Sequence, residues 1–306
     1  MIKQPNPTMK NNKDWSEVDL EAVAEDFIPA TGYFPNPAIK TYEADFGAWN
    51  INDQPVPVAS TFRMAWREYV GSTSGFRTLN TSLIPRGAKH VHAVHALTVP
   101  GNLKVLATIV STCSSILADF WIRSVSGGHI FDNHVRALPH NTATSLTSLT
   151  VPLVLGLNCL TSAYAPLWEE VTGTPWTVDT PIRKAWDRQQ AQNEIDAMVA
   201  LSLGVTADEL CMIYRTQFPV MRKYDQQNLF DANGRLVPKE VVKAEEKAAS
   251  GSKGRPESLS EAERTWTHPQ SGVEYVFEYP FKPMDREAEL RKAYAKYEAV
   301  LAESEK

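Results

Sequence analysis

The sequence changes its hydrophobic period sharply after residue 99, and this change constrains the fold more than any other feature. Before it, three segments alternate apolar and polar residues between Gly/Ser or Arg-Gly turns, which predicts strands over 62–70, 77–85 and 90–99. A largely apolar segment then ends at two glycines and predicts a helix over 102–124. Elements that segregate in this way indicate an α+β fold, with a helix packed on a small, mostly antiparallel sheet.

The rest of the chain is expected to be mainly helical. A short helix is predicted over 14–26, before a proline-rich stretch of little periodicity. Helical patterns dominate after residue 140, although Pro152 should bend or break the first of these helices. The charged stretch 243–264 is poor in apolar residues and predicts a flexible linker. A hairpin that turns at 270–272 should then lead into a final amphipathic helix.

These patterns divide the chain into five expected parts. They are an N-terminal wrapping or partner-docking segment at 1–59, a sheet-and-helix domain at 60–140, a helical domain at 141–242, the linker at 243–264, and a C-terminal hairpin and helix at 265–306. Composition agrees with a globular chain, at 43% hydrophobic and 22% charged residues. No apolar run is long enough to span a bilayer, and the polar start lacks the apolar core of a secretory signal.

Cysteine use and charge indicate where such a chain works and what it meets. The three cysteines lie in apolar segments at no ligand spacing, which predicts buried free thiols in a reducing compartment, hence the cytoplasm. The net charge of −5 hides an asymmetry, because residues 60–140 carry eight Lys or Arg against three acids. Six of the seven histidines fall in the same window. A mildly basic, His-rich module in an acidic chain indicates contact with a polyanion, and chance clustering is the alternative.

Motifs that would assign a catalytic activity are absent from the sequence. It contains no P-loop, no G-x-G-x-x-G after a strand and no G-x-S-x-G elbow. One local cluster has ligand chemistry, since His90 and His92 would share a strand face and two imidazoles can bind a metal. No acidic residue follows to orient them, so two exposed histidines on a half-polar strand are the alternative.

The pieces FRMAWREYV, FRTLNTSLIPRGAKH, LATIVSTCSSILADFWIRSVSGGHI and VRALP occur in this order between residues 62 and 139. Together they resemble the target-recognition region of type IIG restriction–modification enzymes and of their phage-defence relatives of the BREX and DISARM kinds. In that region an arginine-bearing strand precedes an Arg-Thr strand ending in Ile-Pro, then a helix with Asp-Phe and Arg near its end, and a closing Leu-Pro. The matching residues are Arg63 and Arg67, Arg77-Thr78, Ile84-Pro85, Ser115, Asp119-Phe120, Arg123 and Leu138-Pro139.

Later segments extend the resemblance, and one large part of the family is missing. Residues 194–221, 224–238 and 268–290 are similar to the helical segment and far C-termini of the same proteins. The family's Gly-rich AdoMet loop and Asn-Pro-Pro-Tyr-type motif are absent, and the nearest string, FPNPAIK at 34–40, lacks the second proline and the aromatic residue. Base methylation needs both in one pocket. The resemblance therefore implies no cofactor on this chain, and AdoMet on a separate methyltransferase partner.

The resemblance makes 60–140 a DNA target-recognition domain and implies which side chains would contact double-stranded DNA. Arg77 and Arg86 can each donate two hydrogen bonds to guanine, and Asn80 can pair with adenine. Phosphate contacts are expected of Arg63, Arg67 and Lys89. The full expected set is Arg63, Arg67, Arg77, Thr78, Asn80, Arg86, Lys89, His90 and Arg136. The alternative is that Arg63, Arg77 and Arg123 pair with Asp119 and Asp132 inside the fold, and for Arg123 and Asp119, four residues apart on one helix, this is the better interpretation.

The sequence thus predicts a DNA-recognition subunit, or a split C-terminal half, of an adenine-specific DNA methylation, restriction–modification or phage-defence system. It would act with a methyltransferase on another chain, without catalysis of its own and without a membrane. Two alternatives remain open, a non-catalytic interaction scaffold of a defence complex and a metal-dependent hydrolase that uses His90 and His92.

Overall fold

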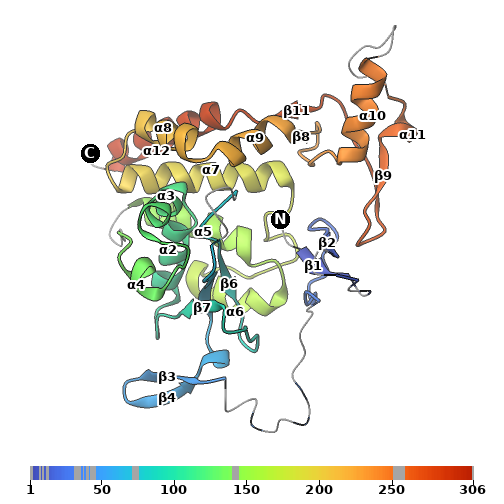
Figure 1. Ribbon diagram of the computed structural model, residues 1–306. Helices are drawn as coiled ribbons and strands as arrows, with labels where there is room; N and C mark the ends of the chain where they lie inside the picture. The colour runs from blue at the N-terminus through green and yellow to red at the C-terminus, as the bar shows by residue number, and fades with distance from the viewer. Residues whose placement is uncertain are drawn as a thin grey trace.

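The protein has an α+β fold, in which small antiparallel sheets are combined with a larger helical part (Figure 1). The computed structural model describes residues 3–6, 8, 10–11, 14–30, 36, 38, 41, 46–70, 76–139, 145–250 and 259–304. The expected fold class, a small sheet with packed helix followed by a helical region, a hairpin and a C-terminal helix, is confirmed.

The central sheet is three-stranded and antiparallel, with the order β6-β5-β7. Its strands are β5 (Arg63–Arg67), β6 (Thr81–Ile84) and β7 (Val94–Leu97). Arg63 of β5 pairs with Ile84 of β6, and Arg67 of β5 pairs with Val94 of β7, so the two ends of β5 pair with different strands. Met64 and Trp66 are buried on the face that meets the helices, as the alternating pattern requires.

The predicted helix over 102–124 is in fact two helices, α2 (Leu103–Cys113) and α3 (Ile116–Val125), which meet at a bend of 70°. Two serines at the break explain it, because Ser114 bonds back to the carbonyl of Val110 and Ser115 caps α3 by accepting from the Ala118 N–H. Asp196 accepts the free Ile116 N–H from outside the helix. Local hydrogen bonds and one buried acid therefore override the continuous apolar pattern.

One large hydrophobic cluster joins the sheet to the helices beyond it. It extends from Phe62 to Leu290 and includes side chains of β5, α2, α3 and the long helices that follow. In Figure 1, α7 lies between a layer that holds the sheet, α2, α3 and α5 and a layer of α8, α9 and α12. These helices are α5 (Ser145–Asn158), α7 (Ala185–Ser202), α8 (Ala207–Gln217), α9 (Pro219–Gln227) and α12 (Arg286–Ser304).

Smaller elements surround this body. On the N-terminal side they are β1 (Lys3–Pro5), β2 (Trp15–Glu17), the hairpin β3 (Ala48–Ile51) and β4 (Gln54–Pro57), and the 3-10 turn η1 (Val58–Ser60). Between the long helices they are α4 (Asp132–Arg136), η2 (Ser162–Tyr164), α6 (Ala165–Thr172) and β8 (Leu229–Phe230). Toward the C-terminus they are α10 (Lys239–Ala249), α11 (Glu261–Arg264), β9 (Thr265–Thr267), β10 (Glu274–Val276) and β11 (Lys282–Pro283).

One sequence prediction is wrong in a way that tertiary contacts explain. The expected helix over 14–26 is absent; its residues form β2 and then an irregular segment, because Asp19 accepts hydrogen bonds from Ser271 and Tyr275 of the distant hairpin. The expected linker at 243–264 includes part of helix α10, whose Val241 is buried. Residues 251–258 of that linker, and most of the string at 34–40, lie outside the described residues.

Several other predictions hold. The break considered at Pro152 is the exception, because α5 continues through this exposed proline, where water can serve the carbonyl that the proline cannot bond. The hairpin is confirmed as β9 paired with β10, and the final helix as α12, which buries Leu290 and Tyr297. All three cysteines are buried and unpaired. Within the described residues, no single helix is long and apolar enough to cross a membrane, although α2 and α3 taken together reach that length and composition.

Candidate nucleic-acid interface

Arg63 is the most deeply buried of the predicted DNA-contacting residues, with 0% of its surface exposed. Its Nη1 donates to the carbonyl oxygens of Val58 and Thr61 at 3.4 and 3.2 Å, and its Nη2 donates to that of Ala88. Burial lowers the pKa of this guanidinium. The side chain joins β5 to the segments on either side of it, and this burial does not favour the phosphate contact predicted for Arg63.

Arg77 and Thr78 are turned into the helical part of the fold. Arg77 Nη1 donates to the carbonyl of Ser114 at 2.8 Å, and its Nη2 lies 4.0 Å from Oδ2 of the fully buried Asp196. The backbone N–H of Thr78 donates to both carboxylate oxygens of Asp119, at 3.2 and 3.0 Å. These contacts explain why the predicted strand over 77–85 is paired only from Thr81 onward. They favour the structural alternative for Arg77 over the predicted base contact, because its guanidinium contacts Ser114 and Asp196.

The structural pairing predicted for Arg123 and Asp119 is confirmed, with Nε to Oδ1 at 2.8 Å. Arg123 also donates to the carbonyl of Gln217 at 2.7 Å and lies 4.2 Å from the centroid of the Phe218 ring. The other pairings considered from the sequence are not formed in this way, since Arg77 meets Asp196 and Arg63 meets carbonyl groups.

Arg86, Lys89 and His90 lie toward the Ile84 end of the sheet, beside two phenylalanine rings. The Arg86 guanidinium lies 4.7 Å from the centroid of Phe62, and Lys89 Nζ lies 5.6 Å from that of Phe46. His90 meets the edge of Phe46 at 5.3 Å, and its partial burial lowers its pKa. Arg86 is exposed, so its guanidinium stays accessible to a phosphate or a base.

Arg67, Asn80 and Arg136 also keep exposed side chains. Among the described residues, Arg67 at the end of β5 has no ion-pair partner. Arg136 pairs with Asp132 one helical turn earlier at 3.3 Å, but both side chains are mostly in solvent, where such pairs are weak. Arg67 is therefore the predicted contact residue least committed to the fold.

Beyond Arg67 the chain bends at Glu68 and carries a cluster of rings. Tyr69 pairs with His129 in an isolated antiparallel bridge, and the Ile130 N–H donates to the Glu68 carbonyl at 2.8 Å. The Glu68 carboxylate is buried, with His129 Nδ1 at 3.0 Å and His95 Nε2 at 3.5 Å. The hydrogen bond from His129 lowers the pKa of Glu68, so the carboxylate stays charged and orients the imidazole.

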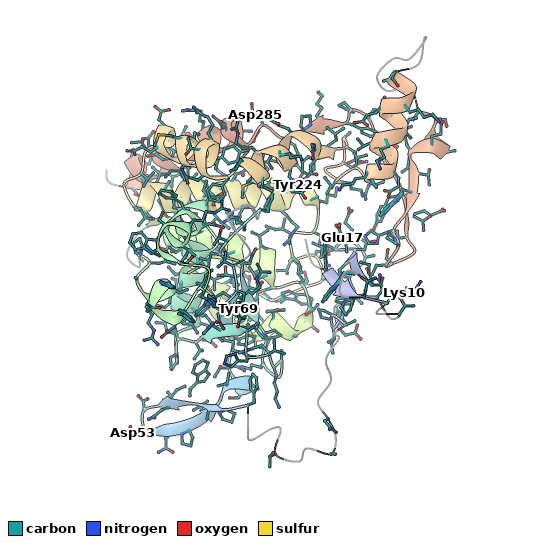
Figure 2. The ribbon with its side chains drawn as sticks, in the orientation of Figure 1. Lys10, Glu17, Asp53, Tyr69, Tyr224 and Asp285 are labelled. Carbon is teal, nitrogen blue, oxygen red and sulfur yellow. The ribbon has the colours of Figure 1, made fainter. Side chains whose placement is uncertain are left out.

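Four side chains of this cluster are accessible and are called here the ring platform: Tyr69, His129, Phe131 and His134. The His129 and Phe131 rings stack at 5.6 Å and 12°, the Phe131 and His134 rings at 6.1 Å and 27°, and Tyr69 meets His129 edge-on at 4.8 Å. Figure 2 marks Tyr69 at the lower part of the body, beside the central sheet. The sequence prediction included none of these residues. The signals that could have found them are the clustering of histidines and the spacing of Tyr69 two residues after Arg67.

The two histidines considered as metal ligands are not arranged as a site. His90 packs on Phe46, whereas His92 is exposed beside Glu68, whose pKa its charge helps to lower. Within the ranges that the structure describes, no group of three or more His, Cys, Asp or Glu side chains is arranged to hold a metal ion.

No family model matches the chain, and neither does any curated protein or solved structure. The functional argument therefore depends on the chemistry of the exposed side chains.

Proposed function

We propose that this chain is a DNA-recognition subunit, or the split C-terminal half, of an adenine-specific DNA methylation, restriction–modification or phage-defence system. The observation that carries the proposal is an exposed arginine beside exposed rings at one end of the central sheet. Arg67 supplies the charge, without an ion-pair partner among the described residues, Tyr69 and Phe131 supply the rings, and the adjacent acid, Glu68, is buried against His129. Phosphate binding needs accessible cations that no internal acid already neutralises.

The charge distribution supports the same proposal. Residues 60–140 carry eight Lys or Arg and three acids, in a chain whose net charge is −5. Of those three acids, Glu68 and Asp119 are buried in contacts with His129 and Arg123, so their charges are largely neutralised within the fold. Arg63 is buried and Arg77 and Arg123 contact internal acids, so the exposed charged residues of this window are Arg67, Arg86, Lys104 and Arg136 against one acid, Asp132. Because most of the chain is acidic, binding should be confined to this face.

The proposal assigns catalysis and AdoMet to a separate methyltransferase, and this chain would position that enzyme on its target. Phosphate contacts from Arg67 and Arg86 would set register, and exposed side chains such as Asn80 would meet base edges. The free buried thiols agree with a reducing compartment, so the proposed location is the cytoplasm.

The direct test is duplex DNA binding measured by fluorescence anisotropy over a range of salt concentrations. Affinity should fall linearly with the logarithm of salt concentration, and Arg67→Ala should reduce the slope by about one. Lys243→Ala is the matched control, because Lys243 is an equally exposed cation on α10, far from the sheet in Figure 1. Binding without a salt slope, or equal slopes for both variants, would contradict the proposal.

A second candidate function, a protein-interaction scaffold, is favoured by one observation. Trp121 and Val125 lie four residues apart on α3, and each has 41% of its surface exposed. Large apolar side chains that share an exposed helix face are typical of protein-docking surfaces. The anisotropy test separates the two functions, because a protein scaffold would lack the phosphate contacts that make the affinity for duplex DNA fall steeply with salt.

A further inference from the structure

The ring platform presents aromatic faces to solvent in a fixed arrangement. Tyr69 has 53% and Phe131 44% of its surface exposed, and the His129 side chain has 44%. Rings that only fill a core would be buried, as Trp66 is at 2%. The arrangement therefore leaves large apolar surfaces uncovered, a feature that usually marks a binding site.

Backbone hydrogen bonds hold these rings in place. The bridge between Tyr69 and His129 puts their side chains next to each other, and the Val70 N–H donates to the Gly128 carbonyl at 3.0 Å. Phe131 begins α4, and its backbone N–H donates to His134 Nδ1 at 3.2 Å, which keeps the two rings together. A surface whose geometry is set in advance loses little conformational entropy when a flat ligand covers it.

The chemistry of the neighbouring groups favours one ligand class. Arg67 is exposed at the end of β5, and Tyr69, also exposed, follows two residues later past a bend at Glu68. Alternating rings and cations are the arrangement with which proteins bind single-stranded nucleic acid, since every base has a face that can stack. In an intact duplex only base edges are available, because the faces are covered by neighbouring bases.

We propose that the ring platform stacks on an unpaired nucleobase of DNA, with Arg67 on the adjacent phosphate. The inference rests on the proposed DNA-recognition function and adds the form of DNA that this surface binds. A base left without its partner when the methyltransferase extrudes an adenine would offer such a face. Covering it would stabilise the opened duplex from the side opposite the enzyme.

The test uses the full chain and three probes, a short duplex, the same duplex with one unpaired 2-aminopurine, and the corresponding single strand. The chain should bind the duplex that holds the unpaired base about 10-fold more tightly than the paired one, which is the worth of one stacked base. The fluorescence of 2-aminopurine should fall on binding, because stacking on an aromatic ring quenches it. Tyr69→Ala and Phe131→Leu should each lose most of the preference and of the quenching, whereas Tyr69→Phe keeps both.

Tyr224→Ala is the matched control. Tyr224 is a tyrosine of similar exposure, 42%, on α9, and Figure 2 shows it in the upper layer, well away from Tyr69. Equal affinity for paired and unpaired probes, without quenching, would overturn the inference and leave the proposed function standing. Loss of the preference in Tyr224→Ala as well would also overturn it. Absence of salt-dependent binding to every probe would overturn the proposed function, and the inference with it.

Discussion

Replacing Arg77 with alanine tests whether this residue supports the fold or contacts DNA. Its guanidinium donates to the carbonyl of Ser114 at 2.8 Å and lies 4.0 Å from Oδ2 of Asp196, whose side chain is completely buried. That oxygen accepts no hydrogen bond, so the charge of Arg77 is its nearest compensation among the described residues. Burial raises the pKa of Asp196, and the two nearby arginines, Arg77 and Arg286, act against this.

The expected loss in the free energy of unfolding is about 3 kcal/mol. Removing one partner of a buried ion pair costs about 3–5 kcal/mol, because the other charge is left without compensation. Several contacts survive and place the loss at the lower end of that range. Asp196 Oδ1 still accepts from the Ile116 N–H at 2.9 Å, and Gln192 still donates to the Ser114 carbonyl, also at 2.9 Å.

Urea unfolding followed by tryptophan fluorescence measures this loss, with Arg67→Ala as the control. Arg67 lies on the same sheet but is exposed, so its replacement should change stability by no more than about 0.5 kcal/mol. Without Arg77, the pKa of Asp196 should rise further, so folding would bind a proton and the loss should shrink as the pH falls. Arg77→Ala within about 0.5 kcal/mol of the parent, together with an altered base preference at one position of the DNA target, would refute this reasoning.

Further substitutions probe other parts of the structure with the same unfolding assay. Thr206→Ala removes the side chain that accepts the Glu209 N–H at the start of α8 and should cost about 1 kcal/mol; an unchanged midpoint would contradict the cap. Arg286→Ala breaks a buried pair in which two hydrogen bonds, at 2.6 and 2.9 Å, join Arg286 to Asp225. It should lower the free energy of unfolding by about 3–5 kcal/mol, more than the loss of an exposed pair would. Glu68 has a lowered pKa, so its contribution is present above about pH 4 and is lost as the pH falls through its folded pKa. The parent should therefore lose more stability on acidification than Glu68→Gln, and parallel pH profiles would contradict the contribution of Glu68.

Local patterns predict those parts of the fold whose stabilising contacts are close in the sequence. The capping box at Thr206 and Glu209 is an example, because both partners lie within one turn. The break between α2 and α3 depends instead on Asp196, about eighty residues away in the sequence, which accepts the Ile116 N–H. Likewise, the segment around Asp19 follows the distant hairpin rather than its own helical propensity. A pattern among neighbouring residues in the sequence cannot reveal contacts between distant segments.

The same limit applies to the candidate site. A basic residue on an alternating strand is equally consistent with solvent, a ligand or a buried acid, and the sequence does not distinguish these. Arg63 and Arg77 turn inward because carbonyl groups and Asp196 meet them there, whereas Arg67 meets no acid within the part of the chain that the structure describes. The ring platform was missed because Tyr69 and His129 are adjacent only through a backbone bridge between distant segments.

The buried contacts of Arg77 and Thr78 show what this pair of residues does in the fold. Asp119 of α3 accepts the Thr78 N–H, and Asp196 of α7 faces Arg77, so the pair attaches the sheet to two helices. Under the proposed function this pair would support the scaffold, and target preference would depend on side chains that remain in solvent around it, such as Arg67 and Asn80. Because these side chains lie outside the hydrophobic core, their replacement should cost little stability, so that the proposed contacts with DNA could change while the fold stays the same.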